Sequence, residues 1–233
     1  MPQDVSTPGS RQSLLTALAD RLMSVKRSHP VRAAIDGVDT AGKTVLADEL
    51  APVILARGRP IIRASIDGFH RPRAERRRLG PDSPEGYYRD SFDYAALLTS
   101  LLLPLGPNGD LRYRRAVFDY RTDSPLDTPI EVAAPDSVLL LDGVFLLRPE
   151  LVDSWDLSIF VDVKFSTTLD RAMRRDVELF GSVTAVEDRY RRRYIPGQQL
   201  YLAEARPREH ADIVVANDDP ENPTMVPRGA QPG

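Results

Sequence analysis

Hydrophobic residues recur along the chain with two different periods. Leu14, Leu18 and Leu22 repeat at helical spacing and predict an amphipathic helix that ends near Pro30. Short apolar runs then predict strands at residues 31–36, 61–66, 137–141, 157–163 and 213–216. Helical periodicity between the first two runs completes a strand, helix, strand unit, which implies a parallel sheet with a right-handed crossover.

Further helices and loops complete the predicted organisation. Residues 92–103 and 166–180 have helical patterns, and Thr184 with Glu187 forms a capping box that predicts the start of another helix. Residues 111–120 favour an extended segment, and residues 68–88, rich in Arg, Pro and Gly, favour a functional loop or lid. The pattern predicts an α/β fold. It divides the chain into an N-terminal tail and helix (1–30), one domain (31–217) and a flexible C-terminal tail (218–233).

Composition excludes several classes of protein. The 233 residues are 42% hydrophobic and 28% charged, as in an ordinary globular domain, and the absence of cysteine excludes disulfides and cysteine nucleophiles. A net charge of −3 argues against nucleic acid or an anionic membrane as the main partner, and no apolar run approaches the roughly 20 residues that a bilayer requires. The first residues lack a secretory-signal pattern. We expect a cytoplasmic protein that acts on a small molecule, as a monomer or a homo-oligomer.

The most specific motif is a glycine-rich loop after the first predicted strand. It fits the pattern G-x-x-x-x-G-K-[ST] with Gly37, Val38, Asp39, Thr40, Ala41, Gly42, Lys43 and Thr44. Because a strand precedes the loop and a helix follows it, backbone N–H groups and the positive end of the helix dipole can hold phosphate oxygens. Lys43 is expected to reach the β- and γ-phosphates, and Thr44 to bind Mg²⁺ through its hydroxyl. The loop predicts a binding site for a nucleoside triphosphate.

Two aspartates follow predicted strands at the edge of the sheet where this loop lies. Asp67 can accept the proton of a substrate hydroxyl or orient that hydroxyl. Asp142, at the tip of a buried strand, is placed where a carboxylate holds Mg²⁺ or its water. Each aspartate precedes a glycine, so a simple turn is the alternative interpretation of both. His70, three residues after Asp67, fits a solvated loop as well as a substrate contact.

Arginines form two further groups. Arg171, Arg174 and Arg175 share one helical face, which fits either a solvent-exposed surface or a lid whose guanidinium groups close over the phosphates. The arginines between Arg71 and Arg78 fit a solvated loop or contacts to an anionic substrate better than a nucleic-acid patch, because acidic residues lie among them.

Together these motifs resemble the uridine kinase and phosphoribulokinase branch of the P-loop kinases, whose relatives include bacterial pantothenate kinase. The similar segments keep the family's order within residues 31–217, at residues 37–44, 67–70, 90–93, 118–120, 142–143, 175–176 and 211–215. The resemblance implies a three-layer α/β/α P-loop NTPase fold with a mainly parallel sheet and a helical lid. It also implies transfer of the γ-phosphoryl group of ATP to an alcohol, with Mg²⁺ as cofactor. Asp67 takes the place of the catalytic base, Lys43 and Arg175 are further catalytic residues, and Asp142 replaces the usual glutamate.

The acceptor site departs from the uridine kinase pattern. Residues 86–90 replace the stretch whose aspartate holds ribose, and residues 121–123 occupy the neighbourhood of the histidine that reads the pyrimidine. The candidate acceptor contacts are His70, Tyr88, Asp90, Asp119 and Arg121. A uridine or cytidine kinase is the first hypothesis, and a pantothenate- or sugar-kinase-like enzyme is the alternative. A nucleotide-switched regulatory NTPase is less favoured because the chain has no guanine-reading N-K-x-D segment.

Overall fold

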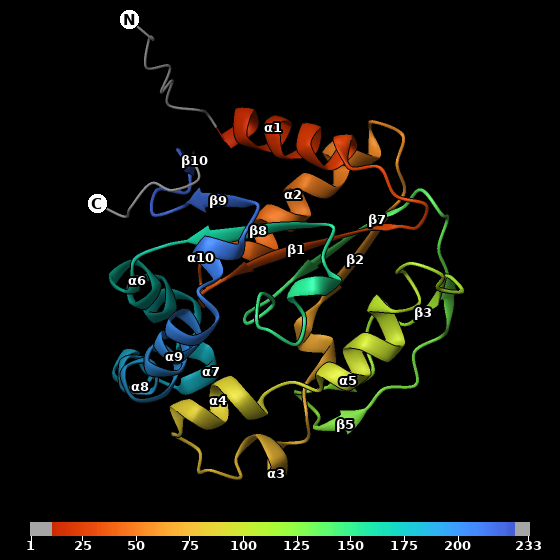
Figure 1. Ribbon diagram of the computed structural model, residues 1–233. Helices are drawn as coiled ribbons and strands as arrows, with labels where there is room; N and C mark the ends of the chain where they lie inside the picture. Colours follow the sequence, from red (N-terminus) through yellow and green to blue (C-terminus); the bar gives the residue numbers. More distant parts are fainter. Residues whose placement is uncertain (1–10, 227–233) are drawn as a thin grey trace, which may run out of the picture.

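A six-stranded sheet forms the centre of the computed structural model, which describes residues 11–226 (Figure 1). The strands lie in the order β10-β9-β8-β1-β7-β2, and every neighbouring pair is parallel except β10 with β9. Their bounds are β1 (Val31–Gly37), β2 (Ile61–Ser65), β7 (Val138–Asp142), β8 (Leu157–Asp162), β9 (Ile213–Ala216) and β10 (Thr224–Val226). Five of these strands coincide with the five predicted apolar runs, so the mainly parallel sheet is confirmed.

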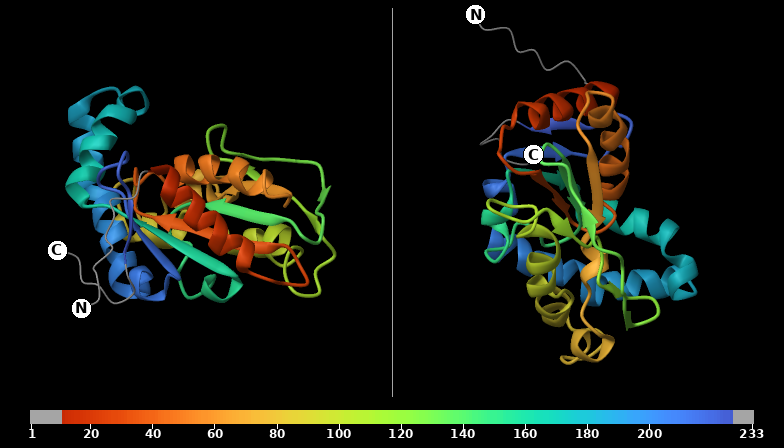
Figure 2. Two further views of the ribbon diagram at one scale, coloured as in Figure 1. Left: turned by 90° about the horizontal axis from the view of Figure 1, so that it is seen from above. Right: turned by 90° about the vertical axis from the view of Figure 1, so that its right-hand side faces the viewer.

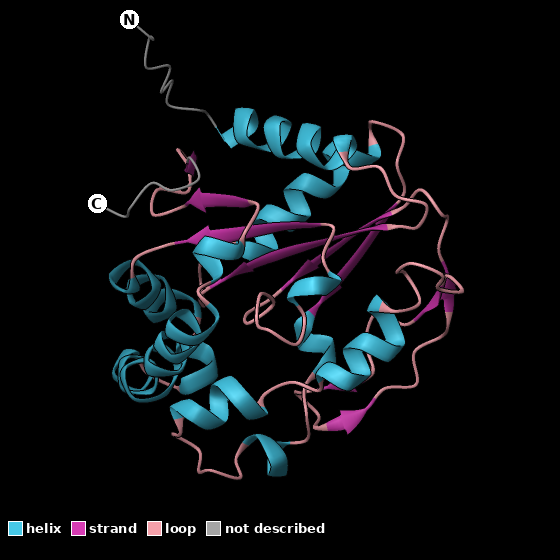
Figure 3. Ribbon diagram, in the orientation of Figure 1, coloured by secondary structure: helices cyan, strands magenta, loops and turns pink. Residues whose placement is uncertain are grey.

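Helices cover both faces of the sheet, which gives the three layers expected from the sequence (Figure 3). The helices are α1 (Arg11–Ser24), α2 (Lys43–Leu55), α3 (Arg73–Arg76), α4 (Pro84–Asp90), α5 (Tyr94–Leu97), α6 (Phe165–Arg175), α7 (Val177–Phe180), α8 (Val183–Arg189), α9 (Ile195–Ala205) and α10 (Pro207–His210). Two short strand pairs, β3 (Arg112–Tyr113) with β6 (Glu131–Val132) and β4 (Phe118–Asp119) with β5 (Ser124–Pro125), lie outside the main sheet. No helix within residues 11–226 is long and apolar enough to cross a membrane.

The buried apolar side chains of the central strands divide between two cores, one on each face of the sheet. In β1, Ala33 and Ile35 pack with α1 and α2, whereas Ala34 faces the core that contains α4, α5 and α9. All seven residues of β1 and all five of β7 are buried, because both faces of these strands are covered. This explains why the sequence shows continuous apolar runs at the central strands.

The segment after β8 forms the helical lid predicted from the sequence. Helices α6, α7 and α8 form an arm that projects from the edge of the sheet (Figure 2). A π-helical segment at Tyr190–Tyr194 connects α8 to α9, which returns to the sheet and packs against α4. The lid therefore leaves the central sheet after β8, and the segments that follow the lid, Tyr190–Tyr194 and α9, pack against α4.

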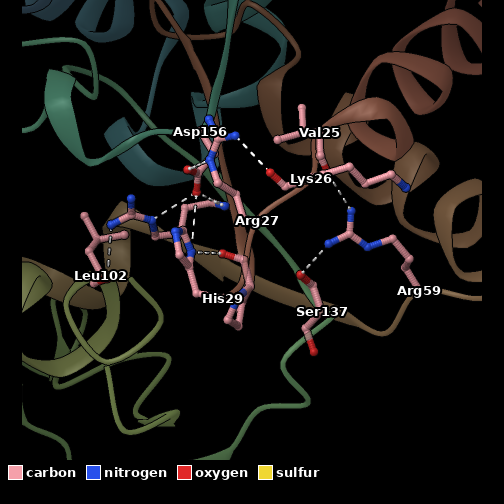
Figure 4. A network of polar contacts seen from close by, with 10 residues as sticks. Val25, Lys26, Arg27, His29, Arg59, Leu102, Ser137 and Asp156 are labelled. Atoms are coloured by element: carbon pink, nitrogen blue, oxygen red, sulfur yellow. Dashed lines mark hydrogen bonds and ion pairs between the residues drawn. The ribbon is translucent and has the colours of Figure 1, made fainter. Parts of the chain in front are cut away.

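A network centred on Asp156 fixes the opposite end of β1 and β8 (Figure 4). Its carboxylate accepts hydrogen bonds from the backbone N–H of Arg32 at 2.9 Å and from Nε of Arg27 at 2.8 Å. Burial alone raises the pKa of Asp156, but these donors and the nearby guanidinium groups lower it overall. Since this carboxylate is almost fully buried, the ionised form contributes to the stability of this end of the sheet.

Three sequence predictions differ from the structure. Residues 68–88, expected to be an irregular loop, contain α3 and most of α4, because Ser83 caps α4 through a bond from Gly86 N and a proline follows at the first helical position. The helix assigned to a capping box at Thr184 begins earlier, and Ser182 supplies the cap. The tail expected after residue 217 includes β10, which pairs with β9, while residues 1–10 and 227–233 lie outside the described residues.

Candidate active site

A cavity of about 270 Å³ lies at the carboxyl ends of the parallel strands and brings the main predicted residues together. Lys43 and Thr44 enter it from the start of α2, Asp67 from the turn after β2, Asp142 from the end of β7 and Arg175 from the end of α6. This edge is where α/β proteins of this architecture bind their ligands. The residues come from four separate parts of the chain, so the fold alone creates this juxtaposition.

A second cavity of about 420 Å³ adjoins the first across the glycine-rich loop. Thr40, Lys43, Thr44 and Arg175 line both cavities. The second cavity also includes Asn217, whose Nδ2 donates to Ala41 O at 2.7 Å and whose Oδ1 has no hydrogen-bond partner within residues 11–226. Two adjoining spaces that share the phosphate-binding loop can accommodate two reactants, one on each side of the group to be transferred.

Backbone geometry explains why the loop contains its two glycines. A Cβ atom at Gly37 would lie 2.3 Å from the backbone oxygen of Val161, so no larger residue fits between β1 and β8. Gly42 has a φ of +92°, in the left-handed region that glycine adopts without strain. These conformations direct the loop around the amino end of α2, where N–H groups are available for an anion.

Lys43 lies inside the loop and is buried. Its Nζ donates to Val38 O at 2.6 Å, which folds the side chain back onto the loop. Burial lowers the pKa of Lys43, and the nearby carboxylates of Asp39 and Asp36 oppose that effect. A phosphate group in the loop would supply a stronger acceptor for this ammonium than a backbone carbonyl does.

Thr44 and Asp142 form a direct contact that fits a magnesium site. Thr44 Oγ1 donates to Asp142 Oδ2 at 2.6 Å, and the other carboxylate oxygen of Asp142 accepts from Arg63 at 2.9 Å. Within residues 11–226 no cluster of three His, Asp or Glu side chains could hold a metal by itself. Mg²⁺ commonly binds through one or two protein oxygens together with water and substrate phosphates, so this hydroxyl and carboxylate match its preference.

Asp67 faces the cavity beside His70. The Nε2 atom of His70 lies 3.5 Å from Asp67 Oδ1, and its Nδ1 lies 3.0 Å from Ser91 O, which fixes the ring. Burial by the cavity walls raises the pKa of Asp67, but His70, Lys43 and Arg175 outweigh that effect and lower it. Asp67 is therefore a carboxylate at neutral pH, and its 57% exposure leaves it accessible to a ligand.

The lid contributes Arg175 through a short polar network. Nε of Arg175 donates to Asp176 Oδ1 at 2.6 Å, and the Tyr190 hydroxyl donates to Asp176 Oδ2 at 2.7 Å. Arg171 instead binds backbone oxygens, those of Thr40 at 3.2 Å and Asn217 at 2.7 Å. Thus Arg171 holds the lid to the loop and Arg175 lines both cavities, whereas Arg174, predicted on the same helical face, is exposed and lines neither cavity.

The candidate acceptor contacts are only partly brought together. His70 lines the cavity and stacks on Phe92, with ring centroids 4.4 Å apart, and its ring lies 5.0 Å from that of Tyr120. The other four candidates do not line this cavity. Tyr88 is buried in the core, and Asp90 pairs with Arg78. Asp119 accepts a hydrogen bond from the backbone N–H of Arg121, whose guanidinium group lies over the Tyr120 ring. The rings of His70, Phe92 and Tyr120 therefore form an aromatic wall of the cavity, and this grouping was not predicted from the sequence.

Two carboxylates at the start of the loop have contacts that the sequence did not reveal: Asp36, which is buried, and Asp39, which was predicted only as a loop residue and is partly buried. Asp36 accepts from the Tyr201 hydroxyl and, at 2.8 Å, from Gly37 N, and burial raises its pKa to about 6. The Asp39 carboxylate accepts from Tyr87 of α4 and from Gln198 of α9. The sequence could have singled out Asp39, because a carboxylate in a phosphate-binding loop repels the phosphate and therefore indicates a further role.

Comparison with known proteins agrees with this geometry, although no protein-family model matches the chain. The uridine kinase of Chlamydia pneumoniae is 29% identical over 195 residues, which cover 81% of this chain and 82% of that protein. The uridine kinase of Ligilactobacillus salivarius is 25% identical over 200 residues, covering 83% and 88%. A solved structure titled a possible uridine kinase from Bacillus stearothermophilus superposes with a TM-score of 0.69 at 20% identity, covering 87% of this chain and 97% of that one. The resemblance to the uridine kinase-like P-loop kinases is therefore confirmed, and the chain has their fold.

Proposed function

We propose that the protein is an ATP- and Mg²⁺-dependent kinase that transfers the γ-phosphoryl group to an alcohol, with a uridine- or cytidine-type nucleoside as the acceptor. The observation that carries this proposal is the single cavity shared by the glycine-rich loop, Asp142, Asp67 and Arg175. The similarity to proteins named uridine kinase supports the same activity.

The residues on the two sides of the loop have distinct proposed roles. The nucleotide occupies the second cavity, and its phosphates cross the loop toward the first cavity, where Lys43 and Arg175 neutralise charge on the transferring group. Thr44 and Asp142 would hold Mg²⁺, which, when bound, neutralises charge on the phosphate oxygens.

Asp67 acts on the acceptor. Its carboxylate accepts the proton of the acceptor hydroxyl as that oxygen bonds to the γ-phosphorus and the bond from this phosphorus to the β,γ-bridging oxygen breaks. The lowered pKa of Asp67 keeps it ionised before the reaction, and His70 orients it. ADP and the phosphorylated alcohol are the products.

The aromatic wall favours a nucleoside among the acceptors that share this chemistry. His70 and Tyr120 line the cavity with rings on which a planar base can stack, and the buried Phe92 stacks on His70 and supports its ring. A sugar or a pantothenate-like alcohol has no planar base and would lack this stacking contact.

A screen of ADP release tests this proposal. Purified protein with ATP and Mg²⁺ is assayed with uridine, cytidine, purine nucleosides, pantothenate and simple sugars, and Lys43→Ala serves as the inactive control. We expect uridine or cytidine to stimulate ADP release most strongly. Stimulation by a sugar or pantothenate alone would replace the acceptor assignment, and release that no alcohol stimulates would contradict kinase activity.

A further inference from the structure

Asp39 occupies a position that nucleotide binding does not explain. It lies within the glycine-rich loop, yet its carboxylate lines the first cavity, beside Asp67, and not the second. A negative charge there repels the polyphosphate. Burial, with a smaller effect from the Asp67 carboxylate, raises the pKa of Asp39, and Lys43 and Arg175 oppose that rise. Because Asp39 is unfavourable for binding of the nucleotide phosphates, we expect it to make a favourable contact with the second ligand, the acceptor.

Two helices from distant parts of the chain hold this carboxylate in place. The Tyr87 hydroxyl of α4 donates to Asp39 Oδ2 at 2.8 Å, and Nε2 of Gln198 on α9 donates to the same oxygen. Gln198 is only 1% exposed, and its Oε1 has no hydrogen-bond partner within residues 11–226. Because both donors use Oδ2, the orientation of Asp39 is fixed while Oδ1 receives no hydrogen bond from the described residues.

The free oxygen limits the chemistry of its partner. An ionised carboxylate only accepts hydrogen bonds, so Oδ1 requires a donor from the ligand. Lys43, Arg76 and Arg175 also line this cavity of about 270 Å³, but an acceptor whose anionic group lies at Asp39 and Asp67 meets two like charges. A neutral compound with several hydroxyl groups can instead donate to both carboxylates.

We propose that Asp39 is a second acceptor-binding carboxylate, which accepts a hydrogen bond from a hydroxyl of a neutral polyhydroxylated acceptor while Asp67 faces the hydroxyl that is phosphorylated. This inference rests on the proposed function and adds a specificity determinant within the phosphate-binding loop. It predicts that the enzyme requires a second sugar hydroxyl that does not react.

The test compares acceptors that differ by one hydroxyl. The wild-type kcat/KM is measured with uridine, 2′-deoxyuridine and 3′-deoxyuridine, and at least one deoxy analogue is expected to be poorer by about 10- to 100-fold, since a hydrogen bond to a charged group is lost. Asp39→Ala is expected to treat uridine and that analogue alike. Asp39→Asn keeps a neutral acceptor oxygen in nearly the same shape and is expected to give intermediate discrimination.

Controls separate binding of the hydroxyl from damage to the loop. ATP affinity is measured by calorimetry for each variant, and Asp20→Ala, which removes an exposed carboxylate on α1, is the matched control and should keep wild-type discrimination. Tyr87→Phe, which removes one of the two donors, should reduce discrimination by less than Asp39→Ala does. Full discrimination in Asp39→Ala would overturn this inference and leave the proposed function standing. A wild-type protein that phosphorylates neither these three nucleosides nor cytidine would reject the nucleoside acceptor on which both rest.

Discussion

Replacement of Asp67 by asparagine separates catalysis from binding and from stability. Asparagine has the same shape but does not accept a proton at neutral pH, so the acceptor hydroxyl loses its base. General bases contribute about 10²- to 10⁴-fold to rate, which corresponds to about 2.7–5.4 kcal/mol in the activation free energy. We expect kcat to fall within this range while ATP affinity changes by less than about threefold, because Asp67 lines the first cavity and not the second.

The stability cost of this substitution is expected to be small. The contact between Asp67 and His70 is 3.5 Å long and the Asp67 side chain is 57% exposed, so solvent screens the pair and the loss is under about 1 kcal/mol. Single-turnover rates, calorimetric titration with ATP and thermal denaturation measure the three effects separately. Asp188→Asn changes a lid carboxylate of similar exposure, 55%, and is the control. Phosphorylation by Asp67→Asn at the wild-type rate would refute the assignment of the base.

Three further predictions concern the loop, the metal and acid stability. Lys43→Ala should abolish detectable turnover in the ADP-release assay, because no other residue of the loop supplies a cation to the transferring phosphate; measurable turnover would contradict that role. Thr44→Val removes the hydroxyl that contacts Asp142 and should raise the Mg²⁺ concentration needed for half-maximal ATP binding by at least about 10-fold, as followed by calorimetry. Folding lowers the pKa of Asp156 from its ordinary value of 3.8, so its stabilising effect is present above that pH and is lost as pH falls through the lower folded pKa. Asp156→Asn should therefore flatten the decline, below about pH 4, of the free energy of unfolding measured by chemical denaturation. An unchanged pH profile would exclude this carboxylate as a source of the decline.

The parts of the fold that local sequence determines could be predicted. The glycine-rich loop is recognisable because its chemistry depends on backbone conformations that only certain residues allow, as the positive φ of Gly42 shows. The strands β1, β7 and β8 are recognisable because burial on both faces leaves continuous apolar runs. Asp67 and Asp142 followed from the same reasoning, since both lie where a parallel strand ends.

The acceptor side depends on contacts between distant segments and could not be predicted in the same way. Tyr88 was assigned to the acceptor, but α4 packs against α9 and places that ring next to Tyr201 in the core, 5.8 Å between centroids. The neighbouring Tyr87 faces Asp39 instead, a one-residue difference that depends on the rotation of α4. Gln198 lies 159 positions after Asp39 in the chain, so only the folded arrangement reveals their contact.

Transfer of label from [γ-³²P]ATP tests the central claim most directly. The protein is incubated with labelled ATP, Mg²⁺ and uridine, and chromatography separates nucleoside monophosphates from ATP and from inorganic phosphate. We predict that the label moves from ATP to a uridine monophosphate, at a rate that depends on Asp67. Label that appears only as inorganic phosphate, with or without uridine and every other alcohol tested, would contradict phosphoryl transfer to an acceptor.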